Sequence, residues 1–551
     1  MPPAHPSWLR PFLSAAAGLL LALAFISGSA SGFAWVVPGI WLWCGAAPGR
    51  WRPLRVGYIG GLAFHLAALH WLTHIPVPVT PVAGWISLSL YLAFFPAVWL
   101  WVCWRCLPCN ARVAQDGTWG QQTDAVLGMP WWQRTAWTLG CAASWVALEM
   151  LQARLLSGFP WNLLGISQYR LFPLTQIASI TGVYGVSFLV AWTSLSLALA
   201  ALRLLRQPAH QWGWMAELRL PLFVVLCVFC AGVLRSSKPV APGREIQLAL
   251  VQPAIPQEVI WDQREDAKRF ARVLQLSQLA VATRPHLLVW PEAARPELTA
   301  ENVRPVQELI QSNRIWMVLG AEDAEARPSA GPDGAYDYFN AAHLLAPDGR
   351  LRATYRKQQL VIFGEFVPLA RWLPFLKRLT PVENGFRSGP GPVPFPIEAP
   401  RCVTSVLICF EDVFPHLVRR HVGIDTDFLL NLTNDGWFGN SAAQWQHAAA
   451  ASFRAVENGR PLVRCTNNGL TCWYDSSGRL RQWLGENSGD PYRSGFLTVR
   501  IPLPPAGQGQ PLTFYTRHGD LFGWGCVGLT LVQLLGRPGR ILRKRRAQLP
   551  T

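Results

Sequence analysis

Glu292, Lys357 and Cys409 are three residues whose types and local settings could do covalent chemistry together. Each ends a short run with strand character: Glu292 follows Val-Trp-Pro, Lys357 follows Tyr-Arg, and Cys409 follows Ser-Val-Leu-Ile. A thiol reacts as its thiolate, and because its free pKa is about 8.5 it needs a base and a nearby cation. Glu292 as the base and Lys357 as the cation, which also stabilises an oxyanion, would complete a nucleophilic acyl-transfer site. Taken alone, Cys409 has the alternative of being a buried structural cysteine.

The composition divides the chain into two parts. Of its 551 residues, 51% are hydrophobic and 15% are charged, whereas a soluble chain is usually about 25% charged. Residues up to about 235 are nearly free of acidic groups, and residues 244–503 have the composition of a globular domain. The net charge of +17 comes from Arg residues that cluster beside apolar runs, as membrane topology demands, so we expect no nucleic-acid partner.

Apolar runs that could cross a bilayer lie on both sides of the globular part. A crossing helix needs about 20 residues, with some spread. The candidate spans are 8–28, 32–48, 56–76, 82–104, 135–153, 173–202, 218–235 and 518–536. A transporter with an accessory domain is an alternative, but few charges lie in the spans and the sequence has no clear pair of broken repeat helices.

The distribution of Arg residues predicts the orientation of these spans. Arg residues lie before the first span, after the second, fourth and sixth, and after the last, whereas the loop 74–82 carries neither Lys nor Arg. The positive-inside rule then places both termini in the cytoplasm. We expect residues 1–235 to form transmembrane helices 1–7, 244–503 a periplasmic catalytic domain, 518–536 the last span, and 537–551 a basic cytoplasmic tail.

Within the globular part, strand-like runs alternate with helical patterns. The predicted strands are Ile246–Val251, His286–Trp290, Trp316–Gly320, Val403–Cys409, Phe428–Leu432 and Leu462–Thr466, and the predicted helices are Ala271–Ala282 and Ala442–Val456. This alternation favours an α/β sandwich, in which strand ends present the chemistry. Glu292 and Cys409 fall at such ends.

The sequence around the three residues resembles the nitrilase superfamily. The segments that carry the resemblance are Trp290–Ala293, Tyr355–Leu360, Phe363–Pro368 and Ile408–Glu411. Four further segments resemble one branch, the apolipoprotein N-acyltransferases: Gly158–Asn162, Asn434–Gly439, Gln444–His447 and Arg464–Gly469. The resemblance covers essentially the whole chain.

The resemblance implies an αββα sandwich beside about eight transmembrane helices, and a Glu-Lys-Cys triad. Cys409 would be the nucleophile, Glu292 the proton acceptor and Lys357 the stabiliser of negative charge. The implied reaction moves a fatty acyl chain from the sn-1 position of a phospholipid, through a thioester, to the amino group of a diacylglyceryl-modified apolipoprotein. No cofactor or metal is implied. The implied setting is a monomer in the bacterial inner membrane. A membrane-tethered amidase with the same triad is the alternative.

Four residues are expected to support the triad. Glu365 lies eight residues beyond Lys357 and could hold the lysine or Glu292 in place. On a continuing strand, Glu411 would face the same side as Cys409. A salt bridge without a role in the reaction is the alternative for both carboxylates. Phe410 and Trp437 complete the set: Trp437 could line the path of the acyl chain or amine, or be an ordinary core aromatic.

Several other features remain open from the sequence. Where the family is expected to carry His and Pro after the lysine, this chain has Gln359 and Ile362. The loop Arg371–Gly389 mixes apolar and basic residues, which suits a membrane-facing lid or a helix packed on the core. Glu149 is costly inside an apolar span and is either functional or paired with Arg154. Finally, spacing cannot decide whether Cys465 and Cys472 form a disulfide.

Overall fold

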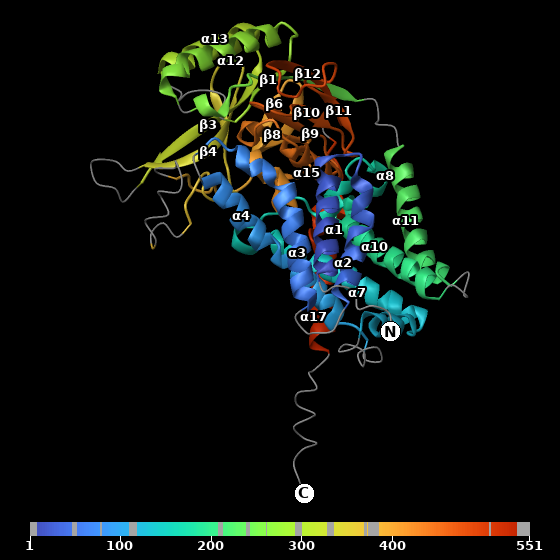
Figure 1. Cartoon of the computed structure of the whole chain (residues 1–551). Coiled ribbons are helices and arrows are strands. Elements are labelled where there is room, and N and C mark those ends of the chain that lie inside the picture. The colour runs from blue at the N-terminus through green and yellow to red at the C-terminus, as the bar shows by residue number, and fades with distance from the viewer. Residues whose placement is uncertain are drawn as a thin grey trace.

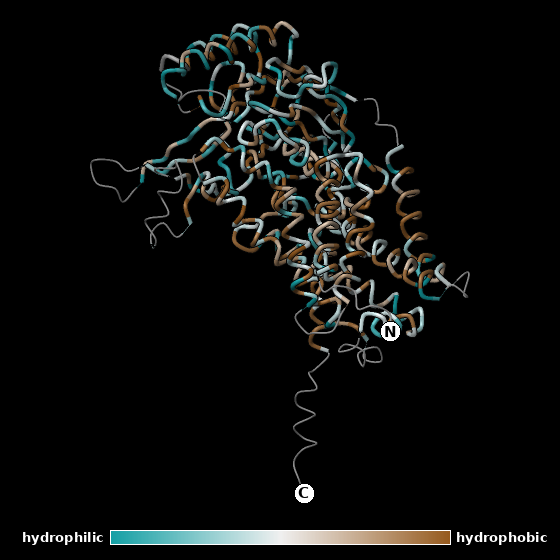
Figure 2. The backbone as a smooth tube through the Cα atoms, in the orientation of Figure 1, coloured by the Kyte–Doolittle hydropathy of each residue, from teal (hydrophilic) through white to brown (hydrophobic). Residues whose placement is uncertain are grey.

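The computed structural model describes a helical part and a sheet part that pack together. The described residues are 8–46, 52–77, 80–108, 118–207, 213–237, 243–260, 262–292, 300–327, 336–368, 372, 385–505 and 508–536. Figure 1 shows the helical part in the lower half and the two sheets, with two helices above them, in the upper half. Figure 2 shows that apolar residues dominate the helical part. Most of the predicted lid loop and all of the predicted tail 537–551 lie outside the described residues.

The helical part combines residues before 237 with residues after 513. Its helices are α1 Leu9–Ile26, α2 Val37–Gly45, α3 Arg52–Ala68, α4 Thr80–Leu92, α5 Phe94–Arg105, α6 Trp119–Leu127, α7 Trp131–Gln152, α8 Phe172–Thr175, α9 Ala178–Thr181, α10 Val183–Arg206, α11 Met215–Ser236, α16 Phe514–His518 and α17 Leu521–Leu535. Among the described residues, four stretches are long and apolar enough to cross a membrane: Leu9–Ile26, Thr80–Arg105, Val183–Arg206 and Met215–Ser236. The plan of eight spans therefore stays a prediction.

The predicted spans 32–48 and 173–202 are divided into shorter helices in the structure, and the α-helix of span 56–76 ends at Ala68. The run 32–48 forms a 3-10 helix at Ser31–Trp35 followed by α2, which has nine residues. A helix of that length reaches about 14 Å, against about 30 Å of hydrocarbon. The run 173–202 divides into α8, α9 and α10, and Gly182 before α10 has φ +68°, a conformation that glycine adopts without strain.

The sheet part contains two six-stranded sheets. The first has the order β12-β1-β2-β3-β4-β5 and the second the order β11-β10-β9-β8-β7-β6. The strands are β1 Arg244–Gln252, β2 Leu287–Trp290, β3 Trp316–Ala326, β4 Tyr336–Leu345, β5 Leu351–Arg356, β6 Pro394–Glu398, β7 Arg401–Ile408, β8 Phe428–Thr433, β9 Leu462–Thr466, β10 Cys472–Tyr474, β11 Leu480–Trp483 and β12 Gly495–Leu503. All six predicted strands are confirmed. The neighbours β1, β2 and β3 run parallel, as do β7, β8 and β9.

The sheets face each other and helices cover their outer faces. On β1, Leu248 and Leu250 belong to the core between the sheets, whereas Ala249 and Val251 belong to the core shared with α12 (Asp266–Val281) and α13 (Ala300–Asn313). This alternation is the period of two that a strand imposes on its side chains. The predicted αββα layering follows, with α15 (Ala443–Asn458) on the outer face of the second sheet.

Helix α15 also joins the sheet part to the helical part. Almost all of its residues are buried, because its apolar residues share one core with β7 to β9 and with the helical part. The indole N–H of Trp161 donates to Gln446 Oε1 (2.7 Å), and the backbone N–H of Val183 donates to Glu457 Oε1 (2.8 Å). The two parts are therefore packed as one unit, and α15 lies between them (Figure 1).

Candidate active site

Cys409 occupies a sharp turn directly after β7. The strand ends at Ile408, and Cys409 begins a 3-10 helix with φ +53°. A non-glycine residue in the left-handed region is uncommon, and such strained positions cluster at functional sites. Hydrogen bonds hold this turn: the backbone N–H of Ile408 donates to Glu411 Oε2 (2.7 Å), and Asn431 Nδ2 donates to the carbonyl of Cys409 (3.0 Å). The turn fixes the direction in which the thiol leaves the strand.

Glu292, Lys357 and Glu365 meet in one buried group around Asn340. Lys357 Nζ lies 2.9 Å from Glu365 Oε1 and 3.6 Å from Glu292 Oε1. Asn340 Nδ2 donates to Glu292 Oε1 (2.8 Å) and to Glu365 Oε1 (2.7 Å). The structure thus brings together the two carboxylates and the lysine that the sequence singled out, although they are 73 residues apart at most in the chain.

The charges of this group act on the Cys409 thiol. Burial would lower the pKa of Lys357, but the carboxylates of Glu365 and Glu292 outweigh it and raise that pKa. Burial, followed by the negative charge of Glu292, raises the pKa of Cys409 well above its usual value, whereas Lys357 acts in the opposite direction. Cys409 is therefore a thiol at neutral pH, and it needs a base at the moment of attack.

Comparison with known proteins places this geometry in a family. The carbon–nitrogen hydrolase model matches residues 247–492, and the model of the apolipoprotein N-acyltransferase N-terminal domain matches residues 17–196. An apolipoprotein N-acyltransferase of Geobacter metallireducens is 34% identical over 536 residues, which covers 94% of this chain and 93% of the relative. The chain belongs to the apolipoprotein N-acyltransferase family. The member from Bradyrhizobium diazoefficiens is 29% identical, with 90% of this chain and 89% of the relative covered. A solved amidase from Nesterenkonia sp. aligns with 57% of this chain and all of its own, at 18% identity and a TM-score of 0.35.

In this N-acyltransferase family member, Glu411 connects two segments of the site. One is the segment after Lys357, here called the lysine loop, and the other is the turn at Cys409, here called the cysteine turn. The chain leaves the strand conformation after Ile408, so Glu411 turns back and is fully buried. Its Oε1 accepts hydrogen bonds from the backbone N–H groups of Gln358 (2.7 Å) and Gln359 (3.1 Å), and the Tyr355 hydroxyl lies 2.8 Å from both carboxylate oxygens. Burial raises the pKa of Glu411 to about 7, while the backbone N–H groups of Ile408, Gln358 and Gln359 and the charge of Lys357 oppose the rise. Glu411 is thus a clamp between two parts of the site.

Replacing Glu411 with glutamine is expected to destabilise the protein and slow its reaction. The amide keeps one acceptor oxygen but places a donor NH2 where a second oxygen now accepts hydrogen bonds, so a buried N–H or hydroxyl loses its partner. Such a loss costs about 1–3 kcal/mol of unfolding free energy. Denaturant unfolding in detergent measures this, with Glu398→Gln on the exposed face of β6 as the control. Equal unfolding midpoints for the two variants would contradict the clamp.

Of the two aromatic residues of the predicted site, Phe410 lies on the side facing the helical part. The Phe410 ring lies 5.8 Å from that of Phe159 and 6.0 Å from that of Trp161, both in the loop after α7. Trp437 lies in the 3-10 helix Asp435–Phe438 and is partly buried. Its neighbour Phe438 contacts Trp161 and Trp71. The rings of Phe410, Phe438 and Trp161 form an apolar surface between the turn at Cys409 and the helical part.

The site contains a residue that sequence reasoning missed. Asn340 lies on β4, and no chemical motif surrounds it in the sequence. It reaches the site because its carbonyl accepts the backbone N–H of Lys357 (2.8 Å), so the pairing of β4 with β5 places its side chain between Glu292 and Glu365. Only cross-strand register could have revealed it.

The structure shows the contacts of Gln359 and Ile362, the two residues that depart from the expected family pattern. Gln359 donates its side-chain N–H to the carbonyl of Ser157 (2.8 Å), which ties the lysine loop to the helical part. Ile362 forms an isolated bridge with Phe366 beside Phe363, whose φ is +61°. Neither residue touches Lys357 or Cys409 through a described hydrogen bond.

The structure also shows the partners of Glu149 and the state of Cys465 and Cys472. Glu149 accepts hydrogen bonds from the Trp145 indole (2.9 Å) and the backbone N–H of Leu164 (2.7 Å), whereas Arg154 pairs with Asp520. The suggested pairing of Glu149 with Arg154 is therefore wrong. Cys465 and Cys472 are free thiols, because they belong to cores on opposite faces of the second sheet.

Proposed function

We propose that this chain transfers a fatty acyl chain from the sn-1 position of a membrane phospholipid to the α-amino group of a diacylglyceryl-modified N-terminal cysteine of apolipoproteins. The observation that carries the proposal is the buried group of Glu292, Lys357 and Cys409, set beside aromatic rings that connect it to the helical part. Membership of the N-acyltransferase family supports both substrate classes.

The first half-reaction forms a thioester. Glu292 accepts the proton of the Cys409 thiol while the sulfur attacks the ester carbonyl of the phospholipid. Lys357 and the backbone N–H groups after Cys409 stabilise the negative charge of the tetrahedral intermediate. The C–O bond then breaks, Glu292 returns the proton to the leaving oxygen, and the lysophospholipid departs. Charge neutralisation by Lys357 matters because the site is buried and the local dielectric constant is low.

The second half-reaction forms an amide. The amine of the apolipoprotein cysteine attacks the thioester carbonyl, and Glu292 takes a proton from that amine. The C–S bond breaks, the proton passes to the sulfur, and the thiol of Cys409 is restored. The two substrates react in turn at one sulfur, which is a ping-pong scheme. The reaction needs no nucleotide, because the acyl group is already activated as an ester.

The proposed setting is the inner membrane of a bacterium. The helical part crosses the membrane, the domain 244–503 lies on the periplasmic face, and both termini lie in the cytoplasm, following the Arg-rich loops. The aromatic surface around Phe410 and Trp161 faces the helical part, where a lipid acyl chain would approach. We propose that the chain works as a monomer.

The acceptor separates this function from the amidase alternative. Purified full-length protein is incubated with phosphatidylethanolamine and then with a diacylglyceryl-cysteine peptide, and mass spectrometry follows the peptide. We expect the peptide to gain one fatty acyl group at its amine, because an amine attacks a thioester carbonyl more readily than water does. A hydrolase would instead release free fatty acid at the same rate with and without the peptide. That second result would overturn the proposed transfer.

A further inference from the structure

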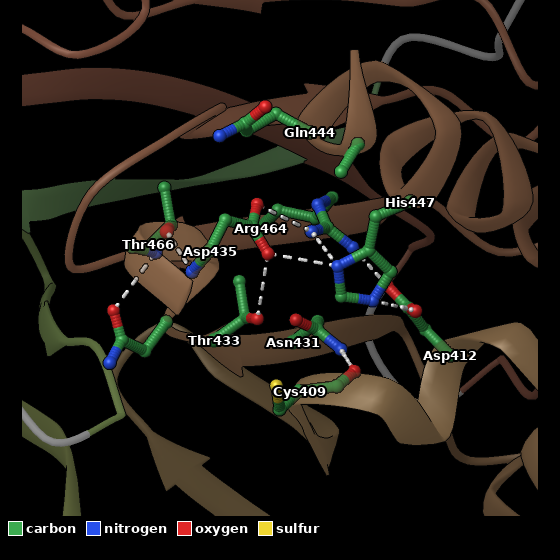
Figure 3. Close-up of polar contacts among 12 residues, drawn as sticks. Cys409, Asp412, Asn431, Thr433, Asp435, Gln444, His447, Arg464 and Thr466 are labelled. Atoms are coloured by element: carbon green, nitrogen blue, oxygen red, sulfur yellow. Dashed lines mark hydrogen bonds and ion pairs between the residues drawn. The ribbon is translucent and has the colours of Figure 1, made fainter. Parts of the chain in front are cut away.

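A buried network of four charged side chains lies behind the cysteine turn. His447 of α15 lies 2.9 Å from Asp435 Oδ1 through Nδ1 and 2.8 Å from Asp412 Oδ1 through Nε2. Arg464 of β9 pairs with Asp412 and lies 3.3 Å from Asp435 Oδ2. All four are essentially fully buried, and Figure 3 shows them grouped around His447. A protonated His447 would make the network neutral, which is the condition under which buried charges are tolerated.

Asp435 is the ionised end of this network that faces the cysteine. Burial would raise its pKa, but His447 and Arg464 outweigh burial and lower it. As a carboxylate, Asp435 can only accept hydrogen bonds. The hydroxyl of Thr433 therefore donates to Asp435 Oδ1 (3.2 Å).

Thr433 lies between Asp435 and the Cys409 thiol. The strands β7 and β8 are parallel, with Ile408 opposite Leu432, so Thr433 follows on β8 where Cys409 follows on β7. Thr433 is fully buried. Its hydroxyl neighbours the Cys409 thiol, and this neighbour acts to lower the pKa of the thiol. Figure 3 shows Thr433 next to Cys409 at the ends of these strands.

We propose that Thr433 is a positioning residue for the thiolate of Cys409, and this proposal rests on the proposed function. In the resting state the thiol donates to Thr433 Oγ1, and the hydroxyl donates to Asp435. When Glu292 removes the thiol proton, the hydroxyl turns and donates to Sγ. Thr433 keeps its own proton throughout. Asp435 tolerates the loss of this donor because His447 and Arg464 remain bound to it.

Burying four charged side chains costs free energy, and the position of Thr433 gives a reason for the network to lie behind Cys409. A hydroxyl without a second partner would rotate freely among its staggered positions. Asp435 holds the hydroxyl of Thr433 in one orientation until the thiolate forms. His447 and Arg464 in turn hold Asp435, and the indole of Trp161 lies 5.4 Å from the His447 ring. The position of the hydroxyl is thereby linked to the packing of α15 against the helical part.

The test compares thiolate formation in variants of the full-length protein in detergent. The reagent is iodoacetamide, and mass spectrometry of the Cys409 peptide gives the alkylation rate from about pH 6 to about pH 10. The variants are Thr433→Val, which keeps the shape, Thr433→Ala as a second loss of the hydroxyl, and Thr433→Ser, which keeps the hydroxyl. Thr404→Val on β7 is the matched control, because Thr404 is equally buried but its hydroxyl donates to the carbonyl of Phe428 (3.0 Å).

Loss of the hydroxyl is expected to move the pH profile upward by about one unit, which lowers the alkylation rate about tenfold at neutral pH. Thr433→Ser should restore the wild-type profile, and Thr404→Val should leave it unchanged. The proposal is overturned if Thr433→Val and Thr433→Ala follow the wild-type profile, if Thr404→Val moves it equally, or if Thr433→Ser fails to restore it. Failure of the proposed function would appear separately, as wild-type protein that forms no acyl-enzyme with phospholipid.

Discussion

Purified Cys409→Ala protein is expected to gain no fatty acyl group when it is incubated with phospholipid, whereas the wild type gains the mass of one. The sulfur of Cys409 is the atom that would carry the acyl chain, and an alanine methyl cannot replace it. Intact-protein mass spectrometry measures this directly. We expect the loss to be complete within the detection limit.

The matched control for this experiment is Cys465→Ala. Cys465 is also buried at a strand of the second sheet, but its Sγ faces the carbonyls of Val251 (3.4 Å) and Val289 (3.5 Å) rather than a lysine. Removing it should leave the mass gain intact. An acyl group on the Cys409→Ala protein, or its absence from Cys465→Ala under conditions where the wild type reacts, would refute the assignment of the nucleophile.

Glu292→Gln is expected to slow acyl-enzyme formation by about 10²–10⁴-fold, the usual contribution of a general base. The glutamine oxygen can still accept from Asn340 Nδ2, so the change removes basicity and charge with little change in shape. The charge of Glu292 raises the pKa of Cys409, so its removal lowers that pKa and increases the thiolate fraction. Alkylation of Cys409 by iodoacetamide should therefore become faster while acylation becomes slower.

Faster alkylation together with slower acylation distinguishes a general base from a residue that only shapes the site. Disruption of the fold would change alkylation and acylation without this pattern, and a pure electrostatic role would speed both. Glu308→Gln is the control, because Glu308 forms an exposed pair with Arg304 on α13. Acylation by Glu292→Gln at the rate of Glu308→Gln would rule out Glu292 as the proton acceptor.

Local pattern was sufficient to predict the strands that carry the chemistry. The runs ending near Trp290 and Ile408 are apolar, rich in Leu, Ile and Val, and both are strands in the structure. Such short runs fit buried parallel strands, because both faces of these strands are covered. The Ala-rich run 442–456 is a helix, α15, for the related reason that it is buried on nearly every side.

The same local pattern was insufficient for the helical part. The apolar run 173–202 has no charge before its end, yet it contains the breaks between α8, α9 and α10. Hydropathy measures how favourably a residue transfers to an apolar environment. It therefore does not distinguish an apolar helix from an apolar turn that is buried. The break at Gly182 depends on packing against Tyr515, which lies more than 300 residues later in the chain.

The sequence by itself determined which residue types meet in this protein: a thiol, a lysine and glutamates, each at the end of its own segment, in a chain with long apolar runs. Only the tertiary structure decided how they are held. Asn340 between two carboxylates, Glu411 turned back onto the lysine loop, and Thr433 between Cys409 and Asp435 all result from strand register and hydrogen bonds between distant segments. The physical reason is that hydropathy and periodicity are properties of neighbouring residues in the sequence. The hydrogen bonds of this site join residues that are far apart in the sequence.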